Sequence, residues 1–76
     1  MSDDQGDPRI YLRIAGELRR RIEAGEFAAD GKLPSVRTLM QAYEVAYDTA
    51  QHAMQTLEAQ GLVRRYPGRG YYVTER

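Results

Sequence analysis

Apolar residues in the first third of the chain recur with the spacing of an amphipathic helix. They lie three or four residues apart and so fall on one face, while most arginines and glutamates fall elsewhere. Asp7 is a favoured N-cap, Pro8 suits the first helical position, and Gly25 supplies a stop. The pattern predicts a helix that begins at Pro8 and ends before Gly25, with one apolar face made of Ile10, Tyr11, Ile14, Ala15, Leu18 and Ile22.

A second, shorter helix is expected after a connector. Phe27 lies in this connector, and we expect its ring to pack into the core from a short extended segment. Leu33 should be extended because the residue before a proline avoids the helical region. Ser35 is a natural N-cap, so we predict a helix over Val36–Tyr43 with Val36, Leu39 and Met40 turned inward.

A third helix follows a break at residues 43–46, which has about the length of a helix-turn-helix turn. This helix covers about residues 47–60 and ends at Gly61. Successive side chains rotate by about 100°, which gathers the apolar residues on one side and the polar ones opposite, with Tyr47 and Thr49 on the flanks. The apolar side holds Ala50, Ala53, Met54 and Leu57, and the polar side holds Asp48, Gln51, His52 and Gln55.

The end of the chain has the pattern of a hairpin. Residues 62–66 and 71–74 read as two short strands joined by Pro67, Gly68, Arg69 and Gly70. The predicted fold is therefore mainly α with a small β-hairpin. Its architecture is a winged helix-turn-helix, with three helices and a C-terminal wing of two or three strands over residues 8–76, preceded by a disordered acidic tail over residues 1–7.

Length and composition narrow the class of protein. Seventy-six residues form one domain at most, with a small core. The chain has no cysteine, no apolar run long enough to span a membrane, and no secretory signal at its start. We therefore expect a cytoplasmic protein that has no disulfide bonds and does not interact with a membrane.

Net charge is zero, but the charges are unevenly distributed. Residues 1–7 and 26–59 each sum to −3, whereas residues 8–25 and 60–76 each sum to +3. The basic charge thus lies on the first helix and on the hairpin. A strongly cationic duplex binder would look different, so we expect modest affinity per monomer for nucleic acid.

The spacing of these residues resembles the DNA-binding domain of the GntR family of transcriptional regulators. The resemblance covers nearly everything after residue 8. Its parts are Tyr11, Ile14, Ala15, Leu18, Ile22 and Gly25, then Leu33-Pro34-Ser35-x-Arg37-x-Leu39, then Val45, Thr49, Ala53, Leu57 and Gly61-Leu62, and finally Gly68-x-Gly70-x-x-Val73.

The resemblance implies a DNA-binding site. In that family the Ser and Arg of the Pro-Ser-x-Arg stretch touch phosphates and base edges, which points to Ser35 and Arg37. The Thr in the first turn of the recognition helix contacts the backbone, and Thr49 holds this position. The wing glycine and its following residue enter the minor groove, which points to Gly68 and Arg69. The candidate site is completed by four residues at the start of the third helix: Ala46, Tyr47, Asp48 and Gln51.

Two departures from the family pattern affect that helix. The family commonly opens it with Ser-Arg, where this chain has Ala46-Tyr47, and Gln51 replaces a frequent arginine. The first change removes a side-chain cap, at a cost of about 1 kcal/mol. Asp48 on the same face should repel phosphate, although a carboxylate accepts from a cytosine amino group and Gln51 can read adenine. Sequence preference should therefore differ from that of typical members.

Each candidate also has a structural interpretation. Ser35 caps a helix, Thr49 can bond to its own backbone, and Tyr47 can sit at the edge of the core. The three hairpin tyrosines, Tyr66, Tyr71 and Tyr72, suit cross-strand packing or a dimer surface better than base stacking.

The expected function is sequence-specific binding of double-stranded DNA. The resemblance implies a transcriptional regulator, most simply a repressor that binds an inverted repeat as a homodimer, formed either in solution or only on DNA. The third helix would occupy the major groove and the wing the minor groove. The alternative is a winged helix that docks onto another protein, with weak or no DNA binding, and Ala46, Tyr47 and Asp48 motivate it.

No catalytic, cofactor or metal site is expected. His52 is the one histidine, and no phosphate-loop pattern or evident pair of catalytic carboxylates is present. In the family a C-terminal effector domain that binds a metabolite follows the wing, whereas this chain stops at Arg76. We therefore expect no small-molecule effector site in these residues, whether the chain is an excised domain or a single-domain regulator.

Overall fold

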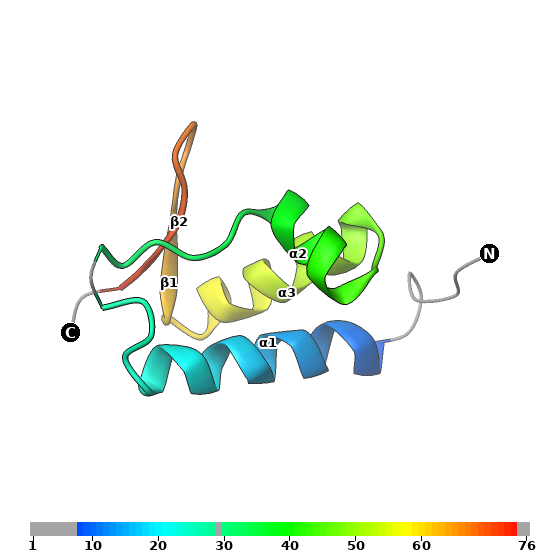
Figure 1. Ribbon diagram of the computed structural model, residues 1–76, viewed down its shortest axis with the longest axis horizontal. Coiled ribbons are helices and arrows are strands. Elements are labelled where there is room, and N and C mark those ends of the chain that lie inside the picture. Colours follow the sequence, from blue (N-terminus) through cyan, green and yellow to red (C-terminus); the bar gives the residue numbers. More distant parts are fainter. Residues whose placement is uncertain (1–7, 29, 75–76) are drawn as a thin grey trace.

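Three helices and one hairpin make up the fold. The computed structural model describes residues 8–28 and 30–74. In Figure 1, α3 lies above α1, α2 lies beside the first part of α3 with its end near α1, and the hairpin stands upright at the end of α3. The fold class is confirmed as a winged helix-turn-helix. Its elements are α1 (Pro8–Glu23), α2 (Val36–Tyr43), α3 (Tyr47–Ala59), β1 (Val63–Tyr66) and β2 (Gly70–Val73).

Glycines end the first and third helices as predicted. Gly25 and Gly61 have φ values of 82° and 79°, a left-handed conformation that suits glycine. After α1 the Glu26 N–H donates to the Arg21 carbonyl at 3.0 Å, and after α3 the Leu62 N–H donates to the Leu57 carbonyl at 3.0 Å. Both bonds satisfy carbonyls that the helix itself leaves without partners.

The start of α2 is also confirmed. The Oγ of Ser35 accepts a hydrogen bond of 3.0 Å from the Thr38 N–H, so Ser35 is the N-cap. The end of α2 is formed differently, because Glu44 holds a left-handed conformation with φ 56° and ψ 50°. The predicted cap at Asp7 and the predicted tail at residues 1–7 lie outside the described residues.

The core lies between α1 and α3, with contributions from α2 and the hairpin. Ile14 and Leu18 of α1 meet Ala50, Ala53, Met54 and Leu57 of α3, and all of these are buried, as is Leu39 of α2. The predicted apolar faces are thus confirmed. Phe27 packs against the same core, but from the turn that follows α1 and not from an extended segment.

The hairpin gains a third strand-like neighbour from the segment before α2. β1 and β2 pair antiparallel, with Val63 opposite Val73 and Tyr66 opposite Gly70. On the other edge of β2, the Leu33 N–H donates to the Tyr71 carbonyl at 3.0 Å and the Val73 N–H donates to the Gly31 carbonyl at 2.6 Å. The wing is therefore joined to the chain that leads directly into Ser35 and α2.

Candidate nucleic-acid interface

The outer face of α3 is set by the side that α3 buries. Ala50, Ala53, Met54 and Leu57 are fully buried. Steps of about 100° per residue place Asp48 and Gln55 directly opposite this buried side. Both residues are exposed, and Tyr47, beside Asp48, is 52% exposed. The start of α3 therefore presents Tyr47 and Asp48 to solvent.

Thr49 does not belong to this outer face. Its exposed fraction is only 3%, and it lies one turn before Ala53 on the same side of the helix. The predicted contact of Thr49 with a DNA backbone stays a prediction, and in this conformation its side chain packs inside the domain. Gln51 is half-buried and lies on the flank of the outer face.

His52 is held toward α1. Its ring stacks on the ring of Tyr11, with the ring centroids 3.7 Å apart and the planes inclined by 13°. The stack spans α1 and α3, so it marks the flank of α3 that faces α1. Sequence reasoning placed His52 among the polar residues and did not anticipate this contact.

The two helices of the helix-turn-helix begin differently. Ser35 caps α2 with its side chain, and its hydroxyl also lies 2.9 Å from that of Thr38. Ala46 holds the N-cap position of α3 in an extended conformation without a side-chain cap bond. The expected loss of a side-chain cap on α3 is confirmed.

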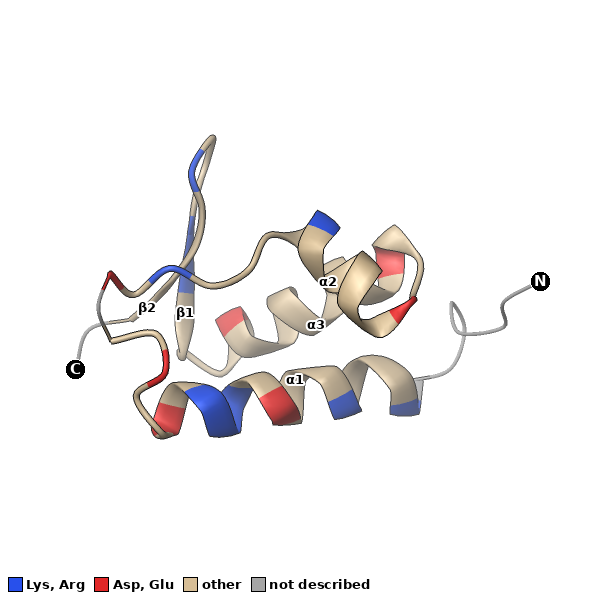
Figure 2. Cartoon of the chain, in the orientation of Figure 1, with Lys and Arg blue, Asp and Glu red and all other residues tan. Residues whose placement is uncertain are grey.

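Positive charge gathers on the hairpin and at the start of α2. Figure 2 shows blue segments there, and red segments where α2 turns into α3. The acidic residues of that turn region are Glu44 and Asp48, both exposed. Arginines of α1 are instead paired locally, as in the Arg13–Glu17 and Arg19–Glu23 ion pairs. Within residues 8–28 and 30–74, no acidic group forms an ion pair with Arg37, Arg65 or Arg69.

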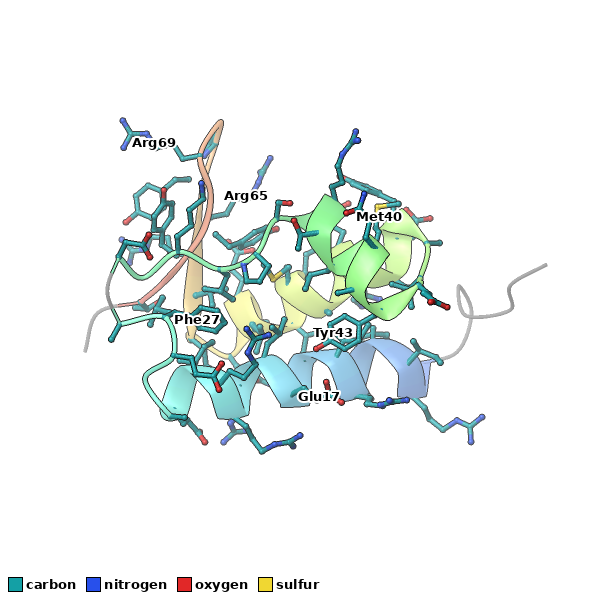
Figure 3. All side chains as sticks on the ribbon, viewed as in Figure 1. Glu17, Phe27, Met40, Tyr43, Arg65 and Arg69 are labelled. Atoms are coloured by element: carbon teal, nitrogen blue, oxygen red, sulfur yellow. The ribbon has the colours of Figure 1, made fainter. Side chains whose placement is uncertain are left out.

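The two labelled arginines of the hairpin point in different directions. In Figure 3, Arg69 extends from the tip away from the helices, whereas Arg65 extends from β1 toward α2. Sequence reasoning chose Arg69 and missed Arg65. A signal was available, because Arg65 comes two residues after the buried Val63 and so shares its face of the strand.

The hairpin tyrosines divide between the core and the outside of the wing. Tyr71 is only 6% exposed and joins the core. Burial raises the pKa of its hydroxyl, and the negative charge of Glu58 raises this pKa further. The rings of Tyr66 and Tyr72 meet edge to face at 5.5 Å, and together with Arg69 they line a shallow hollow of about 250 Å³. The predicted cross-strand packing is confirmed for this pair.

Among residues 8–28 and 30–74, no group of three or more His, Cys, Asp or Glu side chains is placed to hold a metal ion. No helix in the same ranges has the length and apolar character needed to cross a membrane. The chemistry that the site offers is therefore that of exposed arginines, carboxylates, amides and aromatic rings.

The chain is similar in sequence to known bacterial regulators. Residues 10–73 match the family model described as bacterial regulatory proteins, gntR family. The uncharacterized HTH-type transcriptional regulator YjiR of Escherichia coli (strain K12) is 44% identical over 66 residues, which are 87% of this chain and 14% of that protein. The HTH-type transcriptional repressor NagR of Bacillus subtilis (strain 168) is 33% identical over 87% of this chain and 27% of that protein. The chain thus spans only a small part of these relatives.

Solved structures show the same fold. A structure described as AraR(DBD) in complex with operator ORR3 has a TM-score of 0.80 and 31% identity, and the match covers 86% of this chain and 78% of that one. A GntR family transcriptional regulator from Listeria monocytogenes has a TM-score of 0.82 and 34% identity, and covers 100% of this chain and 64% of that one.

Proposed function

The chain belongs to the GntR family of bacterial regulatory proteins and has the winged helix-turn-helix fold of that family's DNA-binding domains; from this premise we propose that it binds double-stranded DNA in a sequence-specific manner and regulates transcription. α3 enters the major groove and the wing reaches the neighbouring backbone and minor groove. The match to AraR(DBD), which was solved in complex with operator ORR3, supports DNA binding.

One observation carries the proposal. Arg65 extends from β1 toward α2 (Figure 3), and Arg37 is exposed at the start of α2. Neither arginine has an acidic partner in the described part of the chain, and Tyr47 and Asp48 are exposed at the start of α3. Phosphates on either side of a major groove are the natural partners for cations that flank a protruding helix.

Each candidate residue receives a role in this arrangement. Ser35 and Arg37 contact phosphates and nearby base edges at the start of α2. Tyr47, Asp48 and Gln51 face the bases, while Ala46 allows the backbone at the start of α3 to approach closely. Gly68 shapes the tip of the wing and Arg69 extends from it, with Arg65 as an additional backbone contact. Thr49 supports α3 from inside and makes no DNA contact in this proposal.

We further propose a homodimer on an inverted repeat, acting as a repressor. NagR, which is named a transcriptional repressor, supports the direction of regulation. Two-fold helix-turn-helix dimers read half-sites about 34 Å apart, or one helical turn. Action on bacterial DNA places the protein in the cytoplasm.

A titration across salt concentrations tests DNA binding. Four to six phosphate contacts per dimer predict a slope of about −4 to −5 in a plot of log affinity against log salt concentration. The measurement is a mobility-shift titration from low to moderate salt on a selected duplex. A flat salt response would exclude the proposed backbone contacts.

A second candidate function is docking onto another protein. The acidic pair Glu44 and Asp48 and the exposed Tyr47 favour it, because they are unusual on a surface that meets phosphates. Replacing Arg37 and Arg69 by alanine separates the two functions. Full cellular activity in both variants would favour protein docking, whereas its loss together with DNA binding would favour the regulator.

A further inference from the structure

We propose that Asp48 determines base specificity by selecting cytosine at one position of each half-site. This inference rests on the proposed function, because it assigns a base to a residue of the helix that enters the major groove. Two features of the structure support it: the direction of the Asp48 side chain and the absence of an arginine or lysine beside it. The chemistry of the base edges in the major groove then selects the base.

The direction of Asp48 follows from both flanks of α3. His52 stacks on Tyr11 of α1, which fixes one flank. Tyr47 and Glu58 lie on one side of the helix. Both raise the pKa of the wing residue Tyr71, because they lie near its hydroxyl, so this other flank of α3 faces the wing. Asp48 lies between these flanks and opposite the buried Ala50, Ala53, Met54 and Leu57. It therefore projects from the middle of the outer face, in the first turn of α3.

The carboxylate of Asp48 is not neutralised by its surroundings. Among residues 8–28 and 30–74, no arginine, lysine or histidine forms an ion pair or hydrogen bond with it. The exposed residues around it on α3 are Tyr47, His52 and Gln55, and none is an arginine or lysine. Asp48 therefore presents two free acceptor oxygens to whatever this face meets.

Only one base suits such an acceptor in the major groove. Guanine presents two acceptors there, and thymine presents an acceptor and a methyl group. Adenine has an amino group, but its N7 acceptor lies beside that donor and repels a carboxylate. Cytosine presents its amino donor alone, so its edge is the match for Asp48.

The same charge has an opposite effect on general affinity. An unneutralised carboxylate close to phosphates repels them, so Asp48 weakens binding to every duplex while it favours one base. Removing the charge of Asp48 should therefore lower the preference for cytosine over the other bases and, at the same time, raise the affinity for non-specific DNA. A merely structural role for Asp48 would not move these two quantities in opposite directions.

Selection of duplexes from a random pool tests the inference, with the wild-type protein and Asp48→Asn compared side by side. The wild-type protein should enrich cytosine at one position per half-site by roughly 5- to 100-fold over other bases. Asp48→Asn should lose enrichment at that position alone, and its affinity for a non-selected duplex should rise by about two- to fivefold. Asp48→Glu keeps the carboxylate and should retain part of the preference.

Two controls sharpen the result. Glu44→Gln removes an equal charge from the adjacent turn, so it should raise general affinity but leave the selected sequence unchanged. Replacing the selected cytosine by 2-pyrimidinone, which lacks the amino group, should reduce wild-type affinity but not that of Asp48→Asn. Thermal unfolding confirms that each variant is folded.

The possible failures are distinguishable. If the wild-type protein selects no sequence at all, the proposed function is wrong and the assignment goes with it. A different outcome is that the wild-type protein selects a sequence whose cytosine preference is kept in Asp48→Asn, or that Asp48→Asn loses enrichment equally at all positions. Either result would leave sequence-specific DNA binding intact and would refute the role proposed for Asp48.

Discussion

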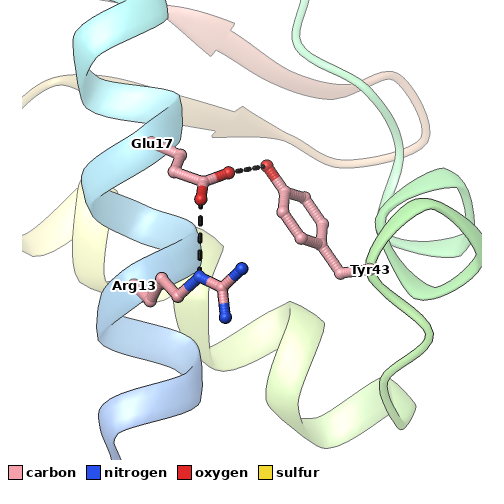
Figure 4. A network of polar contacts seen from close by, with 3 residues as sticks. All are labelled: Arg13, Glu17 and Tyr43. Atoms are coloured by element: carbon pink, nitrogen blue, oxygen red, sulfur yellow. Dashed lines mark hydrogen bonds and ion pairs between the residues drawn. The ribbon is translucent and has the colours of Figure 1, made fainter.

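The hydroxyl of Tyr43 donates a hydrogen bond of 2.9 Å to Oε1 of Glu17, which joins the end of α2 to the middle of α1 (Figure 4). The other carboxylate oxygen of Glu17 faces Nε of Arg13 at 3.5 Å. Leu39 is the fully buried residue of this eight-residue helix, whereas Val36, Met40 and Tyr43 pack against the core and are only partly buried. The bond therefore helps to fix the position from which α2 presents Arg37.

Removing this bond should destabilise the domain. Tyr43→Phe should lower the free energy of unfolding by about 1 kcal/mol, because a partly buried carboxylate loses a hydrogen-bond donor. Denaturant unfolding measures the change. In a double-mutant cycle with Glu17→Ala, the two losses should be less than additive. Full additivity would show that the bond contributes nothing.

Alkaline pH should also destabilise the domain. Burial raises the pKa of Tyr43, and so does its bond to Glu17, while burial and Glu58 raise that of Tyr71. Above their ordinary value of about 10, the unfolded tyrosines lose protons first, so the unfolded state binds fewer protons and stability falls with pH. Unfolding from pH 8 to 11 should show this decline. Tyr43→Phe should make it shallower, and an unchanged slope would argue against the role of Tyr43.

Relieving the backbone at Glu44 should stabilise the domain. A non-glycine residue in the left-handed region costs about 1–2 kcal/mol. Glycine removes this strain, but it loses more conformational entropy on folding, which offsets part of the stabilisation. Glu44→Gly should therefore raise the free energy of unfolding by about 0.5–1 kcal/mol. Gln41→Gly, on the exposed side of α2, is the matched control and should lower it by about 1 kcal/mol. A loss in both variants would contradict the prediction.

The two helix starts offer a reciprocal test of capping. Ala46→Ser should stabilise α3 by about 1 kcal/mol, because a hydroxyl there can accept from the first-turn N–H groups. Ser35→Ala should destabilise α2 by about the same amount, since it removes the bond from the Thr38 N–H. Thermal unfolding of both variants measures the effect, and shifts of the same sign would refute it.

Arginines on the proposed interface should contribute to the salt dependence of DNA binding. Arg37→Ala and Arg65→Ala should each weaken binding across sequences and reduce the magnitude of the salt slope by about 1. Arg20→Ala, at an exposed position on α1, is the control and should leave the slope unchanged. Equal effects in all three variants would mean that general charge, and not position, governs binding.

The elements could be predicted from the sequence because each has a strong local signal. Ser35 marks the start of α2, Gly25 and Gly61 end their helices, and the four apolar residues of α3 define its buried side. These signals depend on neighbours a few residues away, which the chain order reveals directly. The glycine-rich turn of the hairpin is of the same kind.

Details of the site needed the three-dimensional arrangement. Thr49 has an ambiguous flanking position on its helix, and only packing against the rest of the domain decides that it is buried. The stack of His52 on Tyr11 joins residues far apart in the chain. Strand alternation shows that Arg65 shares the face of Val63, but the direction of that face relative to α2 depends on the twist of the hairpin and on where α2 lies, which the local pattern does not give.

The strand-like segment before α2 has a consequence for self-association. Residues 31–33 cover one edge of β2, so within residues 8–28 and 30–74 the open edge of the hairpin is the outer edge of β1, which carries Arg64 and Arg65. Charged residues on an open edge discourage other chains from adding a strand. We therefore expect two copies of this protein to associate through side-chain packing, and its wing to resist edge-to-edge aggregation even at high concentration.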